Sequence, residues 1–140
     1  MHSFRKAVEE RDEAAIQAML ADTVVFTSPV AFKPYVGKPI TAAILRGVLR
    51  VFEDFRYVRE IADSNGRDHA LVFETGIAGV PGVRITGCDF LHVNDDGLID
   101  DFMVMVRPLT GATALSEAMG VQFERIQQEA VEFAQQFTGA

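Results

Sequence analysis

The sequence predicts an α+β fold, in which a curved antiparallel sheet wraps around N-terminal helices and another helix follows the sheet. Apolar residues recur at helical spacing near both ends of the 140-residue chain. Between them, residues 55–108 contain strand-like segments separated by turn signals such as Asn65-Gly66 and Pro81-Gly82. No helical segment interrupts these strands, so neighbouring strands should pair antiparallel.

The first part of the chain should supply the helices inside the sheet. Residues 3–20 have a helical apolar pattern, with a break near Arg11 after which Asp12 can cap a second short helix. Residues 23–28, TVVFTS, are rich in β-branched residues and predict a strand that stops at Pro29. A proline-rich loop follows. A helix should then begin at Ile40, with apolar residues at helical spacing as far as Phe52 and Phe55.

Four strands are expected next, over residues 55–63, 69–78, 83–93 and 98–108, with a turn at Asn94-Asp95-Asp96-Gly97. The chain is then helical from Thr110 to about Phe137, with a break at Gly120 as an alternative. The apolar stripe of this last helix should pack on its own domain or on a sister subunit, and docking of another protein is the alternative. We therefore expect one domain over residues 1–109 and a helical extension over residues 110–140.

Composition excludes several classes of function. A net charge of −7 disfavours nucleic acid and acidic lipid surfaces as partners. No apolar run reaches the roughly 18–20 residues of a membrane span, and the first residues lack an apolar signal core, so we expect a soluble, cytoplasmic protein. The single Cys88 offers neither a disulfide nor a zinc pair. The histidines lack metal-ligand spacing and no phosphate-binding loop is present, so we expect no metal and no cofactor.

Asp89 interrupts the apolar strand over residues 83–93. Alternation places it on one face with Ile85, Gly87, Leu91 and Val93. A carboxyl among such neighbours is the polar group of a pocket, a buried structural group, or, if the strand is turned, exposed. Burial would raise its pKa.

Three blocks of sequence resemble the nuclear transport factor 2-like superfamily, in its SnoaL-like and ketosteroid isomerase-like branch. They are ERDEAAIQAMLADTVVFTSP, YVGKPITAAIL and GCDFLHVNDDGLIDDFMVMVRP, in this order and spacing. The resemblance covers roughly residues 3–109 and implies a cone-shaped sheet, a cystatin-like α+β barrel, with a cavity for a ligand. It does not imply one activity, because the superfamily includes isomerases, cyclases, hydrolases, dehydratases and non-catalytic modules.

The resemblance carries over only part of an isomerase site. The catalytic base of the isomerases corresponds to Ser28, whose hydroxyl cannot act as a base without an activating group. Their oxyanion-binding tyrosine corresponds to Phe4, and two supporting tyrosines correspond to Leu20 and Leu45. Their second, protonated aspartate corresponds to Asp89, which we therefore expect to act as an acid or hydrogen-bond donor.

The same comparison assigns faces to the other strands. The remaining expected pocket residues are Phe26, Tyr35, Leu91, Phe102, Val104 and Val106. Met103, Met105 and Arg107 should face outward and form a homodimer, or be covered by the C-terminal helix of the same chain. Glu74 joins the pocket only in one of two registers of its strand.

Three functions fit these features. The first is a small enzyme that transfers a proton in an apolar, ring-containing molecule, with Asp89 as the acid and with Ser28 and Tyr35 orienting the substrate. The second is a ligand-binding module without catalysis. The third is a structural homodimer whose cone is filled by phenylalanines, namely Phe26, Phe73, Phe90 and Phe102. His92 should face away from the pocket, and Cys88 should be a buried structural thiol.

Overall fold

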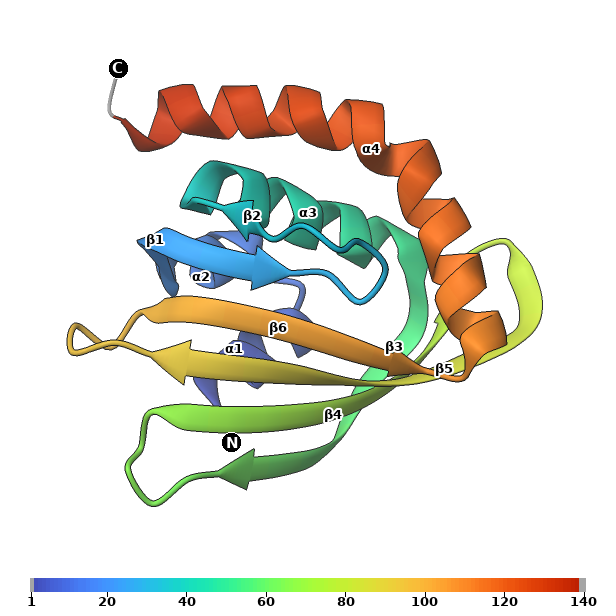
Figure 1. The fold of residues 1–140 in the computed structure, drawn as a ribbon, viewed down its shortest axis with the longest axis horizontal. Helices are drawn as coiled ribbons and strands as arrows, with labels where there is room; N and C mark the ends of the chain where they lie inside the picture. Colours follow the sequence, from blue (N-terminus) through green and yellow to red (C-terminus); the bar gives the residue numbers. More distant parts are fainter. Residues whose placement is uncertain (1, 139–140) are drawn as a thin grey trace.

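The computed structural model describes residues 2–138 and contains both helices and a single mixed sheet. Its elements are, in order, α1 (Ser3–Glu9), α2 (Glu13–Ala18), β1 (Leu20–Thr27), β2 (Tyr35–Val36), α3 (Lys38–Val51), β3 (Phe52–Ala62), β4 (Asp68–Ile77), β5 (Val80–Val93), β6 (Ile99–Arg107) and α4 (Leu109–Phe137). Figure 1 shows a strongly curved sheet, with α4 crossing its end and then running along α3. The predicted α+β class is confirmed.

The strands follow the order β2-β1-β6-β5-β4-β3. All neighbouring strands are antiparallel except β1 and β6, which are parallel. The expectation of a wholly antiparallel sheet is wrong at this pair, because β1 precedes the β3–β6 run and pairs with its last strand. Since β2 and β3 remain as edges, the sheet is curved but does not close into a barrel.

The N-terminal helices break where the sequence predicts. Arg11 adopts a positive φ of 54°, and the Asp12 side chain caps α2 by accepting a hydrogen bond of 3.1 Å from the amide of Ala15. The next helix ends earlier than its apolar pattern indicates. Phe52 and Phe55 lie on β3, where a bulge at Asp54 interrupts the strand alternation between them.

The core fills the concave side of the sheet. Alternation on β5 holds, because Ile85, Asp89 and Leu91 are all buried. Gly87 shares this face, and a Cβ there would lie 2.2 Å from the ring of Phe73. The missing side chain at residue 87 therefore makes room for the Phe73 ring in the floor of the core.

Helix α4 is continuous from Leu109 to Phe137, so Gly120 does not break it, although Figure 1 shows a pronounced bend in its middle part. Its first half contacts β5 and β6 and its second half packs on α3 of the same chain. Two glycines allow α4 to pack closely on the sheet and on α3. A Cβ at Gly111 would lie 2.8 Å from Ile85, and one at Gly47 would lie 2.7 Å from Ile126.

Candidate functional site

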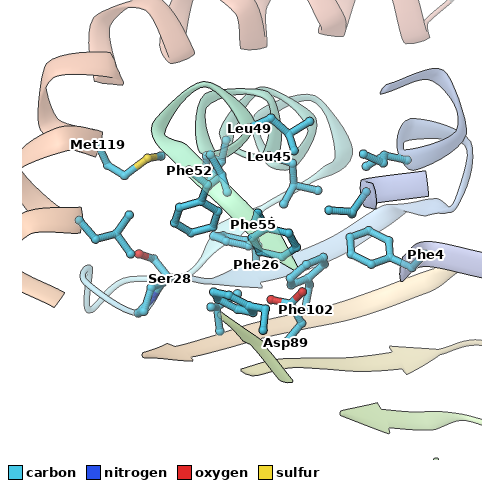
Figure 2. Close-up of a pocket in the computed structure, with 18 of the residues that line it drawn as sticks. Phe4, Phe26, Ser28, Leu45, Leu49, Phe52, Phe55, Asp89, Phe102 and Met119 are labelled. Atoms are coloured by element: carbon cyan, nitrogen blue, oxygen red, sulfur yellow. The ribbon is translucent and has the colours of Figure 1, made fainter. Parts of the chain in front are cut away.

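An apolar pocket lies between the inner face of the sheet and the helices (Figure 2). Leu45 and Leu49 cover it from α3, whereas Asp89 and Phe102 belong to the sheet. Every element except β2 contributes to the lining, which comprises Phe4, Val8, Ile16, Phe26, Ser28, Pro29, Val30, Ile44, Leu45, Val48, Leu49, Phe52, Phe55, Tyr57, Phe73, Asp89, Phe102, Val104, Leu115 and Met119.

Most of the residues expected in a pocket lie at this one: Phe4, Phe26, Ser28, Leu45, Asp89, Phe102 and Val104. The other four do not line it. Leu20 and Leu91 are fully buried in the core away from the cavity. Tyr35 lies on the edge strand β2, where its ring is 6.4 Å from that of Phe123, and Val106 lies near the end of β6, beyond the pocket.

Asp89 is the carboxylate of the pocket, and its partner is a residue that the sequence analysis did not single out. The hydroxyl of Tyr57, on β3, donates a hydrogen bond of 2.7 Å to Oδ2 of Asp89. Both side chains are buried, with exposed fractions of 4% and 6%. Oδ1 of Asp89 accepts no hydrogen bond from residues 2–138 and is not fully buried, so this atom is available to a molecule in the pocket.

The environment makes Asp89 a group that titrates near neutrality. Burial raises the pKa of its carboxyl to about 7, although the hydrogen bond from Tyr57 works in the opposite direction. Burial and the neighbouring Asp89 charge raise the pKa of Tyr57 well above its usual range. Tyr57 therefore remains a proton donor, while Asp89 can exist in either form at pH 7.

Ser28 takes part in a turn at the edge of the pocket. Its Oγ accepts a hydrogen bond of 3.1 Å from the amide of Val30, as serine often does after a strand. No carboxylate or histidine among the described residues hydrogen-bonds to this hydroxyl, so the structure provides no group that would activate Ser28 as a base.

The other polar candidates face away from the pocket. The register of β3 and β4 pairs Glu74 with Arg56, and the two side chains form an exposed salt bridge of 2.8 Å. His92 is paired with Asp100 at 2.7 Å, and this hydrogen bond raises the pKa of the imidazole. Cys88 is half-buried, and burial raises its pKa.

Residues 2–138 contain no cluster of three or more acidic, histidine or cysteine side chains that could hold a metal ion. Over the same residues, no helix is long and apolar enough to cross a membrane.

The cavity is small, with a volume of about 70 Å³. Cavities that bind one benzene ring measure about 150 Å³, and drug-sized ligands occupy roughly 300 Å³ or more. The pocket must therefore widen before it can admit a ring. Phe52 and Phe55 stack at 5.6 Å within it, and Met119 lines it from α4.

Comparison with known proteins identifies the class to which this fold and pocket belong. The model of the SnoaL-like domain family matches residues 1–102, and the chain belongs to this family. No curated protein matches the chain. The matched range ends before α4, so Leu115 and Met119 are lining residues that the family match does not include.

Solved structures agree with this assignment. The chain is 38% identical to a steroid delta-isomerase from Pseudomonas aeruginosa, with a TM-score of 0.81 and 89% of each chain covered. It is 35% identical to an uncharacterised protein with a cystatin-like fold from Silicibacter pomeroyi DSS-3, with a TM-score of 0.78 over 86% of this chain and 82% of the other. A putative polyketide cyclase from Pseudomonas putida KT2440, at 17% identity and a TM-score of 0.63 over 78% and 89% of the chains, shares the fold.

Proposed function

We propose that this protein binds a small, largely apolar molecule bearing a carbonyl or phenolic oxygen and transfers a proton within it, using Asp89. The observation that carries the proposal is the buried pair of Tyr57 and Asp89 in an apolar pocket. Apolar walls favour a hydrophobic ligand, and a few convergent polar groups orient it. The similarity to a protein described as a steroid delta-isomerase supports a ring-containing substrate.

The two forms of Asp89 suit the two halves of a proton transfer. When protonated, the carboxyl can donate through Oδ1 to a ligand oxygen, while Tyr57 holds Oδ2. When ionised, Oδ1 can accept a proton from a carbon next to a carbonyl. A pKa of about 7 keeps both forms accessible at neutral pH. Asp89 is the one carboxylate among the lining residues, so it both takes and returns the proton.

The test uses two probes. A phenol tests binding of the ligand oxygen, and the NMR chemical shifts of Tyr57 and Asp89 report that binding. A β,γ-unsaturated cyclic ketone tests turnover, followed by the ultraviolet absorbance of its conjugated isomer. We expect the wild type to bind phenol and isomerise the ketone, and Asp89→Asn to lose isomerisation. Failure of the wild type to bind either probe would overturn the proposal.

A ligand-binding module without catalysis is the second candidate. The observation that favours it is Ser28, which stands where the resembled isomerases place their base and whose Oγ accepts a backbone hydrogen bond. Phenol binding without any ketone turnover by the wild type would select this candidate over the enzyme.

We further propose that the outer sheet face forms a homodimer. Apolar side chains lie in two cross-strand rows on this face, Val72–Cys88–Met105 and Ala70–Phe90–Met103, and Arg107 follows on β6. Met105 is 54% exposed, unusual for a central strand unless another surface covers it.

Light scattering after gel filtration tests the dimer. We expect Met105→Glu to give monomers, whereas Val121→Glu, which adds the same charge at an exposed apolar position on α4, should leave the dimer intact. A monomeric wild type would contradict this assembly.

We also expect the protein to be cytoplasmic, where the Cys88 thiol stays reduced, and cell fractionation tests that location.

A further inference from the structure

A second concave site lies outside the apolar pocket, in a groove between the α1–α2 turn, α3 and α4. The groove has a volume of about 350 Å³ and is lined by Arg11, Glu13, Arg46, Leu49, Arg50, Arg125 and Glu129. We propose that it binds a phosphate group, either inorganic phosphate or the phosphate of a small organic monoester. This site requires no proton transfer at Asp89, so it stands or fails independently of the function proposed above.

The charge of the groove is opposite to that of the protein. The chain carries a net charge of −7, yet the lining contains four arginines and two glutamates, which leaves a surplus of two positive charges. Arginine keeps its charge at any physiological pH. Burial works to raise the pKa of Glu129, but hydrogen bonds from Arg50 and Arg46 outweigh it and lower that pKa, so this carboxylate stays ionised. The surplus is therefore permanent and matches the charge of a phosphate dianion.

Two of the arginines build the groove and hold α4 on α3. Arg50 contacts both oxygens of Glu129, through Nη2 at 2.8 Å and Nη1 at 3.1 Å, and Arg46 donates to Oε2 at 3.0 Å. The guanidinium of Arg46 also lies 4.5 Å from the ring centroid of Phe133. These contacts fix the floor of the site, because the Glu129 side chain is only 10% exposed.

The other two arginines supply the surplus charge. Arg125 lies 4.0 Å from Glu129, too far for a hydrogen bond, and its side chain is 64% exposed. Arg11 forms no ion pair within residues 2–138 and donates from Nη2 to the carbonyl of Leu49. Each guanidinium retains further N–H donors. Two such forks in the lining of one groove suit the oxygens of a phosphate better than a point charge would.

The experiment measures binding of inorganic phosphate and, separately, of glycerol 3-phosphate at constant ionic strength, with chloride as the reference. Side-chain Nε resonances of arginine in ¹H–¹⁵N spectra report the site. We expect saturable shifts at Arg11 and Arg125. Arg11→Gln and Arg125→Gln should each weaken binding about tenfold, as expected for loss of hydrogen bonds to a charged group. Both variants spare the Glu129 contacts that hold α4, so circular dichroism should remain unchanged.

Arg56→Gln is the matched control, because it removes the same charge from an exposed arginine on β3. It should bind phosphate like the wild type. Tighter binding of the monoester identifies an organic phosphate, and tighter binding of the inorganic ion identifies free phosphate; either result supports the site. Linear shifts without saturation, or equal affinity in all the variants, would overturn the proposal.

Discussion

Replacing Asp89 by asparagine should reverse a pH-dependent cost to stability. Burial raises the pKa of this carboxyl from 3.8 to about 7, so the folded protein holds the proton more tightly than the unfolded chain. Protonation of Asp89 therefore stabilises the folded protein. This stabilisation is fully present below about pH 3.8, the pKa of the unfolded chain, and is lost as the pH rises through about 7, the pKa of the folded protein. At 1.36 kcal/mol per pKa unit, the whole loss is about 4 kcal/mol. Asparagine is similar in shape and does not ionise, so it escapes this loss.

The assay is urea unfolding followed by far-ultraviolet circular dichroism, since the chain has no tryptophan. Between pH 5 and pH 8, the free energy of unfolding of Asp89→Asn should rise by about 3 kcal/mol relative to the wild type. Any constant cost of placing an amide in the pocket cancels in this comparison. Other titrating groups, such as the His92–Asp100 pair, cancel because both proteins contain them.

Glu74→Gln is the control for loss of a carboxylate. Glu74 forms an exposed salt bridge with Arg56. The free energy of unfolding of Glu74→Gln should therefore stay within about 1 kcal/mol of the wild-type value at every pH. A flat difference between Asp89→Asn and the wild type over the same range would refute the reasoning, because it would mean that Asp89 is not destabilised as an anion.

Three further predictions concern the pocket. Tyr57→Phe removes the hydrogen bond to Oδ2 of Asp89, worth about 1.5–3 kcal/mol to a charged group, and should move the Asp89 pKa up by about 1–2 units, as measured by carboxyl ¹³C shifts; an unchanged pKa would contradict the geometry. Gly87→Ala places a Cβ against the Phe73 ring and should lower the free energy of unfolding in urea by about 1–3 kcal/mol and shift the NMR signals of that ring. Gly66→Ala is the control. The φ of 73° at Gly66 disfavours a side chain, but a Cβ there meets nothing within 4 Å, so the signals of the Phe73 ring should not change. Leu115→Ala should cost about 2–5 kcal/mol and enlarge the pocket, so that benzene raises the melting temperature of the variant more than that of the wild type.

The sequence was sufficient for the face of β5 that carries Asp89, because strand alternation is a local rule. Asp89 is buried with Ile85 and Leu91 on one face of β5, as the period of two requires. Tyr57 was missed although Phe55 and Tyr57 lie two positions apart, as residues on one face of a strand do. Charged residues are interspersed through the surrounding FEDFRYVREIA segment, and the helical pattern before it extended to Phe55. The signal was present in the pair of aromatic residues two positions apart.

The α4 side of the pocket could not be predicted in the same way. Whether Leu115 and Met119 reach the pocket depends on where α4 crosses the sheet, and that placement depends on long-range contacts. Gly111 allows close approach to Ile85, and Gly47 allows close approach to Ile126. In a sequence, neither glycine differs visibly from a helix breaker. The parallel pairing of β1 with β6 is another long-range choice that no local pattern encodes.

The packing of the residues that line the pocket also indicates how the pocket can open. The rings of Phe4, Phe73 and Phe102 are about 1% exposed and tightly packed, so they cannot move without disturbing the core. Met119 is half-buried, flexible and on α4, whose second half is anchored to α3 by the Glu129 ion pairs. Movement of Met119 and of the first half of α4 would widen the cavity from outside the segment that the family model matches. The size of ligand that this protein accepts should accordingly depend on α4 as well as on the segment that the family model matches.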